Sequence, residues 1–225
     1  TKQYFLLSWV LAAATTLGTA CGPPPASTPS GGGTAPTGGA APDAADLGDP
    51  VEGDWLVTRL GAEPALLNPI LDQLDANGRY IMDLVGDSLL DVDKETLLSV
   101  PRLASSWEIS EDQLTYTFHL KEDLVFSDNV PLTVEDVKFT FDLLKDPKTD
   151  SSAVRSYFSD VLSAEIVDED TIKFVCEKPY FRHVMTIGSM PVMPKHIYGT
   201  GDINKHPANR APVGSGPYRF EAWDT

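Results

Sequence analysis

Few side chains in this sequence are spaced for covalent chemistry. Metal-ligand spacing is absent among the four histidines, His119, His183, His196 and His206. There is no H-E-x-x-H motif and no phosphate-binding G-x-x-x-x-G-K-S/T loop. Gly214-Ser215-Gly216 is no G-x-S-x-G nucleophile motif, because Val213 stands where its first glycine is needed. We therefore predict a protein that is not an enzyme and that uses no metal and no cofactor.

The remaining reactive residue types have structural explanations. The glycines around Ser215 give the backbone freedom for a tight turn before a strand. The paired carboxylates Glu135 and Asp136 suit the first turn of a helix, where acidic residues complement the helix dipole. Cys176 shares one face of a strand pattern with Ile172 and Phe174, which predicts a small core residue rather than a reactive thiol.

The charge balance argues against one class of partner. The chain carries 17 Lys and Arg against 33 Asp and Glu, a net charge of −16. Such a balance leaves no basic patch, so it disfavours nucleic acid and direct docking on anionic lipid. The acidic residues are spread along the chain, which is typical of a solvated surface.

Apolar periodicity predicts the elements that hold these side chains. Apolar and polar residues alternate from Leu114 to Lys121, the period of a half-buried strand that follows the polar turn 110–113. Thr133-Val134-Glu135-Asp136 has the form of a helix N-terminus, and Pro147 ends the helix. We also predict a helix at 77–90 and strands at 55–60, 164–167, 171–177 and 218–223.

The first 53 residues predict an export signal followed by a tether. A charged start, a short apolar run and small residues lead to Cys21, which resembles a bacterial lipobox. The resemblance implies cleavage before Cys21 and lipidation of that residue, so we assign residues 1–21 to a lipoprotein signal peptide. The alternative is a buried core helix that ends in a free thiol. Residues 22–53 are rich in Gly and Pro and predict a disordered tether with a reach of about 30 Å.

The region from 101 to 147 resembles a known family. Its recurrent motifs are those of the extracellular solute-binding proteins of family 5, the peptide, dipeptide and nickel receptors of ABC importers. The matching segments are LASSWE at 103–108, LTYTF at 114–118 and PLTVEDV at 131–137. Three glycines of the family pattern are replaced here by Gln113, Asp123 and Asn129. These departures raise a question of turn geometry, because glycine takes the left-handed backbone conformation at the least cost.

The resemblance implies an α/β fold of the type II periplasmic-binding-protein class, in which two lobes close over a solute. We expect residues 54–225 to form only part of that receptor. By analogy with the family, residues 54–88 and 190–225 belong to the first lobe and residues 89–190 form an inserted domain. The opposing lobe is expected to be absent from this sequence.

The same resemblance implies a function. It is that of a monomeric substrate-binding lipoprotein of an ABC importer, anchored to the membrane through lipid on Cys21 in the cell envelope. It would capture a peptide or similar small solute outside the cytoplasmic membrane and deliver it to the permease subunits. Family analogy implies solute contacts at Asn77, Arg79 and Tyr80, where Arg79 meets a carboxylate and Tyr80 stacks or donates a hydrogen bond.

Two alternatives stay open. Arg79 and Tyr80 are also what an ordinary exposed helix start would carry. A surface-anchored signalling or adhesion protein would use the same receptor fold without transport. The sequence does not choose among peptides, nickel complexes and sugars as the solute.

Overall fold

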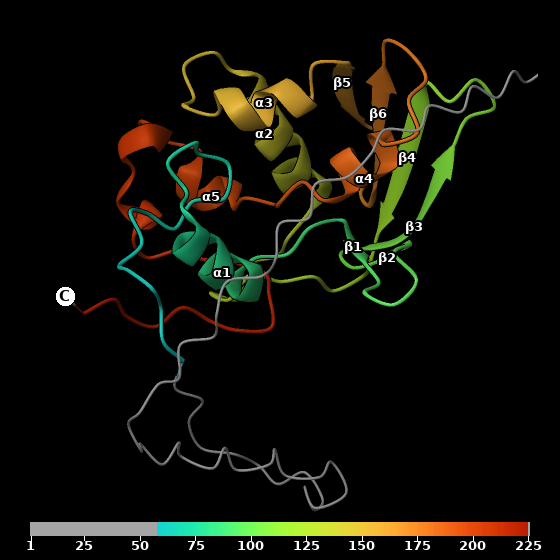
Figure 1. Ribbon diagram of the computed structural model, residues 1–225. Coiled ribbons are helices and arrows are strands. Elements are labelled where there is room, and N and C mark those ends of the chain that lie inside the picture. The colour runs from blue at the N-terminus through green and yellow to red at the C-terminus, as the bar shows by residue number, and fades with distance from the viewer. Residues whose placement is uncertain (1–57, 225) are drawn as a thin grey trace, which may run out of the picture. The chain divides into compact units, whose positions relative to one another are not determined.

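The alternating residues between 114 and 121 form one strand of the main sheet. In the computed structural model, which describes residues 58–224, strand β3 (Ala104–Ile109) pairs antiparallel with β4 (Thr115–Leu120) (Figure 1). Every second side chain of β4, namely Tyr116, Phe118 and Leu120, is buried. The predicted strand and the turn before it are therefore confirmed.

The strands predicted at 164–167 and 171–177 complete this sheet. Strand β5 (Val161–Ile166) pairs antiparallel with β6 (Thr171–Cys176), and the strand order is β3-β4-β6-β5. The outer face carries a polar row, in which Glu108, Thr117, Lys173 and Glu165 occupy paired positions. Lys173 Nζ lies 2.8 Å from Glu165 Oε2 across β6 and β5. Polar side chains on one face and buried apolar ones on the other leave a single face for the core.

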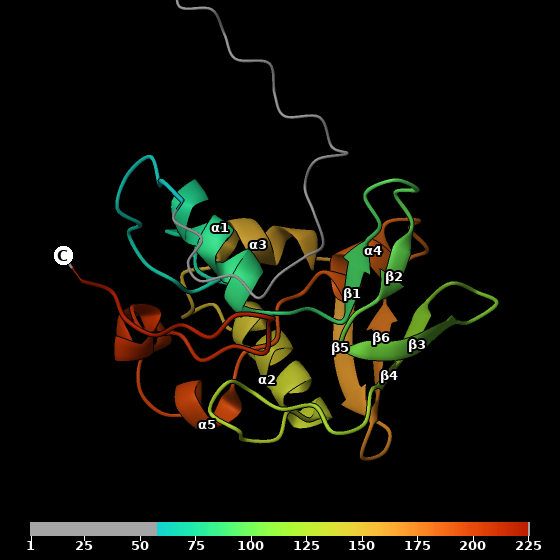
Figure 2. The ribbon, with the colours of Figure 1, turned by 90° about the horizontal axis from the view of Figure 1, so that it is seen from below.

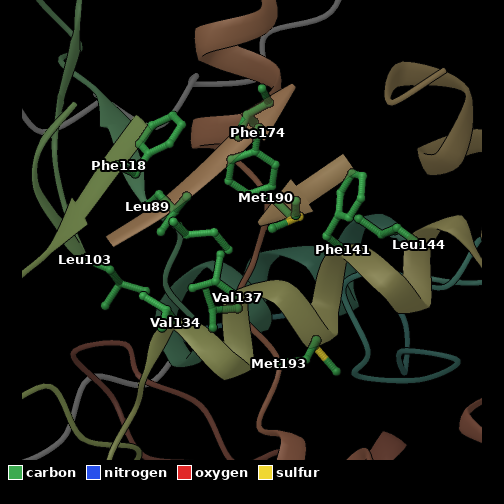
Figure 3. Close-up of a cluster of buried hydrophobic side chains, with 14 of the residues drawn as sticks. Leu89, Leu103, Phe118, Val134, Val137, Phe141, Leu144, Phe174, Met190 and Met193 are labelled. Carbon is green, nitrogen blue, oxygen red and sulfur yellow. The ribbon is translucent and has the colours of Figure 1, made fainter. Parts of the chain in front are cut away.

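Helix α2 (Val134–Lys145) packs against that apolar face (Figures 1 and 2). Phe118 and Phe174 of the sheet face Val137 and Phe141 of the helix (Figure 3). The rings of Phe141 and Phe174 meet edge to face, with centroids 5.6 Å apart. Burial of these large apolar side chains is the main contribution to the stability of this layer.

The ends of α2 follow the local signals in the sequence. The Thr133 N–H donates a hydrogen bond to Asp136 Oδ2 at 2.9 Å, as in a capping box. Glu135 and Asp136 lie in the first turn, and Lys145 lies in the last. The helix stops one residue before the Asp146-Pro147 pair. The predicted helix and its start are confirmed.

Smaller elements surround this sheet and helix. Helix α1 comes first, a two-stranded sheet follows it, and short helices connect or follow the main strands. Their bounds are α1 (Ala76–Val85), β1 (Leu90–Val92), β2 (Ser99–Pro101), α3 (Ser152–Tyr157), α4 (His183–Gly188), α5 (Lys195–Tyr198), η2 (Ile203–Lys205) and η3 (Pro207–Asn209). None of the described helices has the length and apolar character needed to cross a membrane.

The segments predicted to form the first lobe contact each other. The Leu67 N–H donates to the Asn209 carbonyl at 2.7 Å, and the Gly216 N–H donates to the Val85 carbonyl at 2.8 Å. The buried Asn68 amide donates to Asn209 Oδ1 at 2.8 Å. The boundaries of lobe and inserted domain stay a prediction.

Two charged side chains fix the position of helix α3. Asp72 accepts hydrogen bonds from the N–H and hydroxyl of Ser152 and from the Ala153 N–H, at 2.7, 2.6 and 3.0 Å. Chiefly because of the Ser152 hydroxyl, the pKa of the Asp72 carboxyl lies below its usual value. Arg155 donates to the carbonyls of Leu144, Asp146 and Thr149, and so joins α3 to the end of α2.

Three positions where the family pattern has glycine take the left-handed backbone conformation. The φ angles are +58° at Gln113, +55° at Asp123 and +68° at Asn129. The turn geometry is therefore the one glycine would give, although the side chains differ. Asn and Asp tolerate this conformation better than Gln does, so the strain is expected to be greatest at Gln113.

Three predicted elements differ from the structure. The helix predicted at 77–90 ends at Val85, and its last residues turn into β1. Residues 218–223 form no strand, because their only described backbone bond runs from the Tyr218 N–H to Leu84. Residues 58–60 of the strand predicted at 55–60 are also outside any strand, and the rest of that strand lies outside the described residues.

Glycine is required on either side of Ser215 for a different reason from the one predicted. Neither Gly214 nor Gly216 has a positive φ. Instead, a Cβ atom on Gly214 would overlap the Val85 carbonyl, and one on Gly216 would lie 2.6 Å from the Leu84 carbonyl oxygen. The segment therefore needs glycine for its close approach to the end of α1.

Candidate functional site

A groove with a volume of about 720 Å³ lies among α1, α3 and α4. Residues from the segment 86–91, Lys94, Arg102 and the Met190-Pro191 pair are also part of its lining. These segments are far apart in the sequence, and tertiary packing brings them together. A concave site with apolar walls and a few polar groups is the usual form of a small-molecule site.

The groove walls carry unusually exposed apolar side chains. Tyr157 at the end of α3 is 72% exposed and Met185 of α4 is 41% exposed. Met82 and Met190 lie deeper and are buried. Thioether side chains adapt their shape to different partners, so this wall suits a variable apolar group.

An ion pair lies in the same lining. Arg102 Nε is 2.7 Å from Asp87 Oδ1, and its Nη1 is 3.8 Å from Asp91 Oδ2. Burial raises the pKa of the Asp87 carboxyl, and the hydrogen bond and charge of Arg102 offset only part of that effect. Because its side chain is 14% exposed, Asp87 is the less accessible member of the pair. We interpret Arg102 and Asp87 as structural, since each neutralises the other.

Two further arginines in the groove are not engaged in this way. Arg79 of α1 and Arg182, which precedes α4, are both exposed and line the groove. Among residues 58–224, neither guanidinium group makes a hydrogen bond or a salt bridge with a carboxylate. Each therefore keeps its planar set of donors free for another molecule.

The structure separates the three residues predicted to contact solute. Arg79 lines the groove, whereas Asn77 and Tyr80 do not. The Asn77 side-chain oxygen accepts a hydrogen bond from the Gly61 N–H at 3.2 Å, and the Tyr80 side chain is 46% exposed. A role in binding stays a prediction for all three residues.

Sequence reasoning missed Tyr157, Arg182 and Met185. Tyr157 ends α3, Met185 lies in α4 and Arg182 precedes α4. The two helices span only six residues each and have too few turns for a clear helical period. The exposed Tyr180-Phe181-Arg182 run was the available signal, because large aromatics beside a cation are typical of binding surfaces.

The other residues with potential for chemistry offer no second site. Cys176 is buried, and burial raises the pKa of its thiol to about 11, which confirms a core residue without thiolate character. Within the described part of the chain, no group of three or more His, Cys, Asp or Glu side chains is arranged to hold a metal ion. Cys21, the predicted lipidation site, lies outside the described residues.

Comparison with known proteins finds one family whose model matches this chain. The model of the bacterial extracellular solute-binding proteins, family 5 Middle, matches residues 99–225. The chain spans about a quarter to a third of the length of the curated relatives it matches.

Several solved structures share the fold. The ABC transporter substrate-binding protein CtaP from Listeria monocytogenes is 34% identical, with a TM-score of 0.66 over 74% of this chain and 34% of that one. NikZ from Campylobacter jejuni, in complex with Ni(L-His), is 34% identical, with a TM-score of 0.65 over 72% of this chain and 32% of that one. The oligopeptide-binding protein AppA from Bacillus subtilis, in complex with a nonapeptide, is 26% identical, with a TM-score of 0.65 and the same coverage.

Proposed function

This chain belongs to the bacterial extracellular solute-binding proteins of family 5, and from that premise we propose that it serves as the substrate-binding lipoprotein of an ABC importer. It captures peptides or similar small solutes outside the cytoplasmic membrane and passes them to the permease. The likeness to the ABC transporter protein CtaP supports the transport role.

The observation that carries the proposal is the groove among α1, α3 and α4. It has a volume of about 720 Å³, which is within the range of small-molecule sites. Its lining combines exposed Tyr157 and Met185 with the guanidinium groups of Arg79 and Arg182, which make no salt bridge within the described part of the chain. Exposing large apolar side chains costs solvation free energy, and a bound solute would recover it.

The proposed solute is a peptide or a compound of similar size. NikZ is in complex with Ni(L-His) and AppA with a nonapeptide, so the same fold holds solutes of quite different length. Affinity would come from burying the solute between two closing lobes, and release from the importer reopening them. The steps are conformational, and no covalent bond is made or broken.

A thermal-shift screen of the full-length, tag-purified protein tests the proposal. The panel contains di-, tri- and nonapeptides, nickel with L-histidine, and sugars. A ligand at 100 times its Kd adds about 2.7 kcal/mol to the free energy of unfolding, which raises the melting temperature measurably. A folded protein that shows no shift with any member of the panel would contradict the receptor function.

Lipid anchoring needs a separate test, because Cys21 lies outside the described residues. We propose that Cys21 carries the lipid that holds the receptor at the outer face of the cytoplasmic membrane. Metabolic labelling with a palmitate analogue should label the wild-type protein and leave the Cys21→Ser variant unlabelled. The Cys176→Ser variant is the matched control and should label as the wild type does. Equal labelling of the wild type and Cys21→Ser would refute the anchor.

A further inference from the structure

We propose that a second groove, at the end of β4, docks an extended segment of a partner protein in which apolar residues lie beside lysine or arginine. We call it the acidic groove, and residues of the segments 120–125, 131–133 and 169–170 line it. It shares no lining residue with the groove among α1, α3 and α4. The inference therefore concerns a different surface from the proposed solute site.

Backbone contacts bring the three lining segments together. The Leu120 N–H donates to the Asp170 carbonyl at 2.8 Å, which joins the end of β4 to the turn between β5 and β6. The Leu132 N–H donates to the Leu124 carbonyl at 2.9 Å, which closes a short hairpin just before α2. The acidic groove has a volume of about 370 Å³, at the lower end of the range for small-molecule sites. Its size suits a few side chains of a longer segment.

The charge of the lining is the first argument. Four exposed carboxylates, those of Glu122, Asp123, Glu169 and Asp170, accompany one lysine, Lys121. Among residues 58–224, the Glu122, Asp123 and Glu169 side chains accept no hydrogen bond and form no salt bridge. The net charge of −16 attracts a basic partner, and these carboxylates would pair with its cations. Because no group of three described His, Cys, Asp or Glu side chains could hold a metal ion, ammonium or guanidinium groups fit better.

Apolar side chains lie between these carboxylates. Val125 is 51% exposed, and Pro131 is exposed as well, whereas Leu120 and Leu132 of the lining are buried. A small hydrated cation would leave Val125 and Pro131 in water. An occupant that carries apolar groups beside its cations would cover both side chains and recover solvation free energy.

The backbone of Val125 is the third argument. Val125 forms an isolated antiparallel bridge with Pro131, and the flanking bonds run from the Phe126 N–H to the Val130 carbonyl and from Leu132 to Leu124. Val125 and Pro131 are thus a non-hydrogen-bonded pair, so the Val125 N–H and carbonyl point away from the opposite arm. Neither group has a partner among the described residues. An extended segment can pair with such free main-chain groups, which a small cation cannot do.

Valine methyl signals provide a direct test, because Val125 lines the acidic groove and Val154 lines the other one. The probe is acetyl-Lys-Lys-Val-Val-Lys-Lys-amide, added to the full-length protein with methyl-13C valine. It should shift the Val125 signal in a saturable way and leave Val154 in place. Val125→Ile and Val154→Ile assign the two signals. A peptide with serine in place of both valines should bind about tenfold more weakly, since it loses the apolar contact.

Substitutions then test the carboxylates. Glu122→Gln combined with Glu169→Gln should weaken binding of the valine-containing probe about tenfold, or about threefold for each surface pair. Asp123 is left unchanged, because its φ of +55° makes its backbone sensitive to substitution. Glu95→Gln combined with Glu111→Gln is the matched control. It changes the net charge equally at two exposed residues outside both linings, and it should bind the probe nearly as the wild type does.

The outcomes distinguish a docking groove from other kinds of binding. A silent Val125 signal overturns the inference, and so does a control variant that loses as much affinity as the groove variant, because net charge alone would then explain binding. Equal binding of the serine peptide, or an equal response to spermidine, would indicate a site for small cations and refute docking of a protein segment. A shift of Val154 instead of Val125 would place the probe in the proposed solute site. None of these results depends on the thermal-shift panel, so the receptor function stands or falls separately.

Discussion

Substitution of Arg155 gives the sharpest prediction about stability, because this one side chain joins the end of α2 to the start of α3. Its guanidinium group donates to the carbonyls of Leu144 at 2.8 Å and Asp146 at 2.7 Å, to the Thr149 carbonyl, and to Ser151 Oγ at 3.1 Å. The last carbonyls of a helix have no partner within the helix, so the bond to the Leu144 carbonyl satisfies a group that would otherwise depend on water. The Asp146 and Thr149 carbonyls also accept backbone N–H groups, so there the guanidinium group is a second donor. Arg155→Met keeps the apolar stem and removes every donor.

The expected loss follows from these contacts. A hydrogen bond to a charged group contributes about 1.5–3 kcal/mol, but Arg155 is half-buried and water can reach part of the site. We therefore expect Arg155→Met to lower the free energy of unfolding by about 3 kcal/mol, less than the sum of its bonds. For a protein region of this size, that corresponds to a fall in melting temperature of about 6–12 °C.

Urea unfolding followed by tryptophan fluorescence measures this loss, with thermal unfolding as a second readout. Arg155→Lys should recover only a minor part of it, because an ammonium group cannot reach carbonyls that lie in the directions of a planar fork. Arg219→Met should change the free energy of unfolding by less than about 0.5 kcal/mol, as expected for an exposed side chain that has no hydrogen-bond or salt-bridge partner among the described residues. An Arg155→Met variant within about 1 kcal/mol of the wild type, or a fully stable Arg155→Lys variant, would refute the reasoning.

Three further predictions concern backbone and charge. Gln113→Gly should raise the free energy of unfolding by about 0.5–1 kcal/mol in urea, because glycine takes the left-handed conformation without steric strain. The greater conformational entropy of glycine in the unfolded chain offsets part of this gain. A loss of stability would contradict the prediction. Gly214→Ala should destabilise it by about 2 kcal/mol, since the new methyl group meets the Val85 carbonyl, and an unchanged midpoint would show that the contact relaxes freely. The pKa of Asp72 is lowered by folding, so its ionised form stabilises the protein above pH 3.8 and that contribution fades as the pH falls through the lower folded pKa. Asp72→Asn should therefore be destabilised at pH 7 and approach the wild type in acid, and a difference that is independent of pH would argue against it.

Sequence patterns correctly predicted the elements that depend on residues close to one another in the chain. The alternation along β4 and the capping signal at Thr133 depend on residues that are neighbours in the sequence, and both predictions are confirmed. The strand predicted at 218–223 failed for the opposite reason. A strand needs a neighbour to accept and donate its backbone bonds, and periodicity carries no information about that neighbour.

The candidate site was predictable only in part. Family analogy predicted solute contacts for Asn77, Arg79 and Tyr80 together. Side chains one and two positions apart on a helix, however, point in different directions. The structure accordingly leaves Asn77 and Tyr80 outside the groove lining and places Arg79 in it. No sequence pattern could have distinguished among the three, because the distinction depends on where α3 and α4 pack.

The same reasoning explains why a groove with an excess of cations occurs in so acidic a chain. Net charge is a property of composition, whereas the charge that a solute meets depends on which side chains remain unpaired where it binds. Asp87 and Asp91 are paired with Arg102, whereas Arg79 and Arg182 have no carboxylate partner among residues 58–224, so a ligand in the groove meets a local charge that differs from the average of the chain. Each of these arginines would look like an ordinary surface residue in the sequence. Only the tertiary packing of α1 and the start of α4 brings them to one groove.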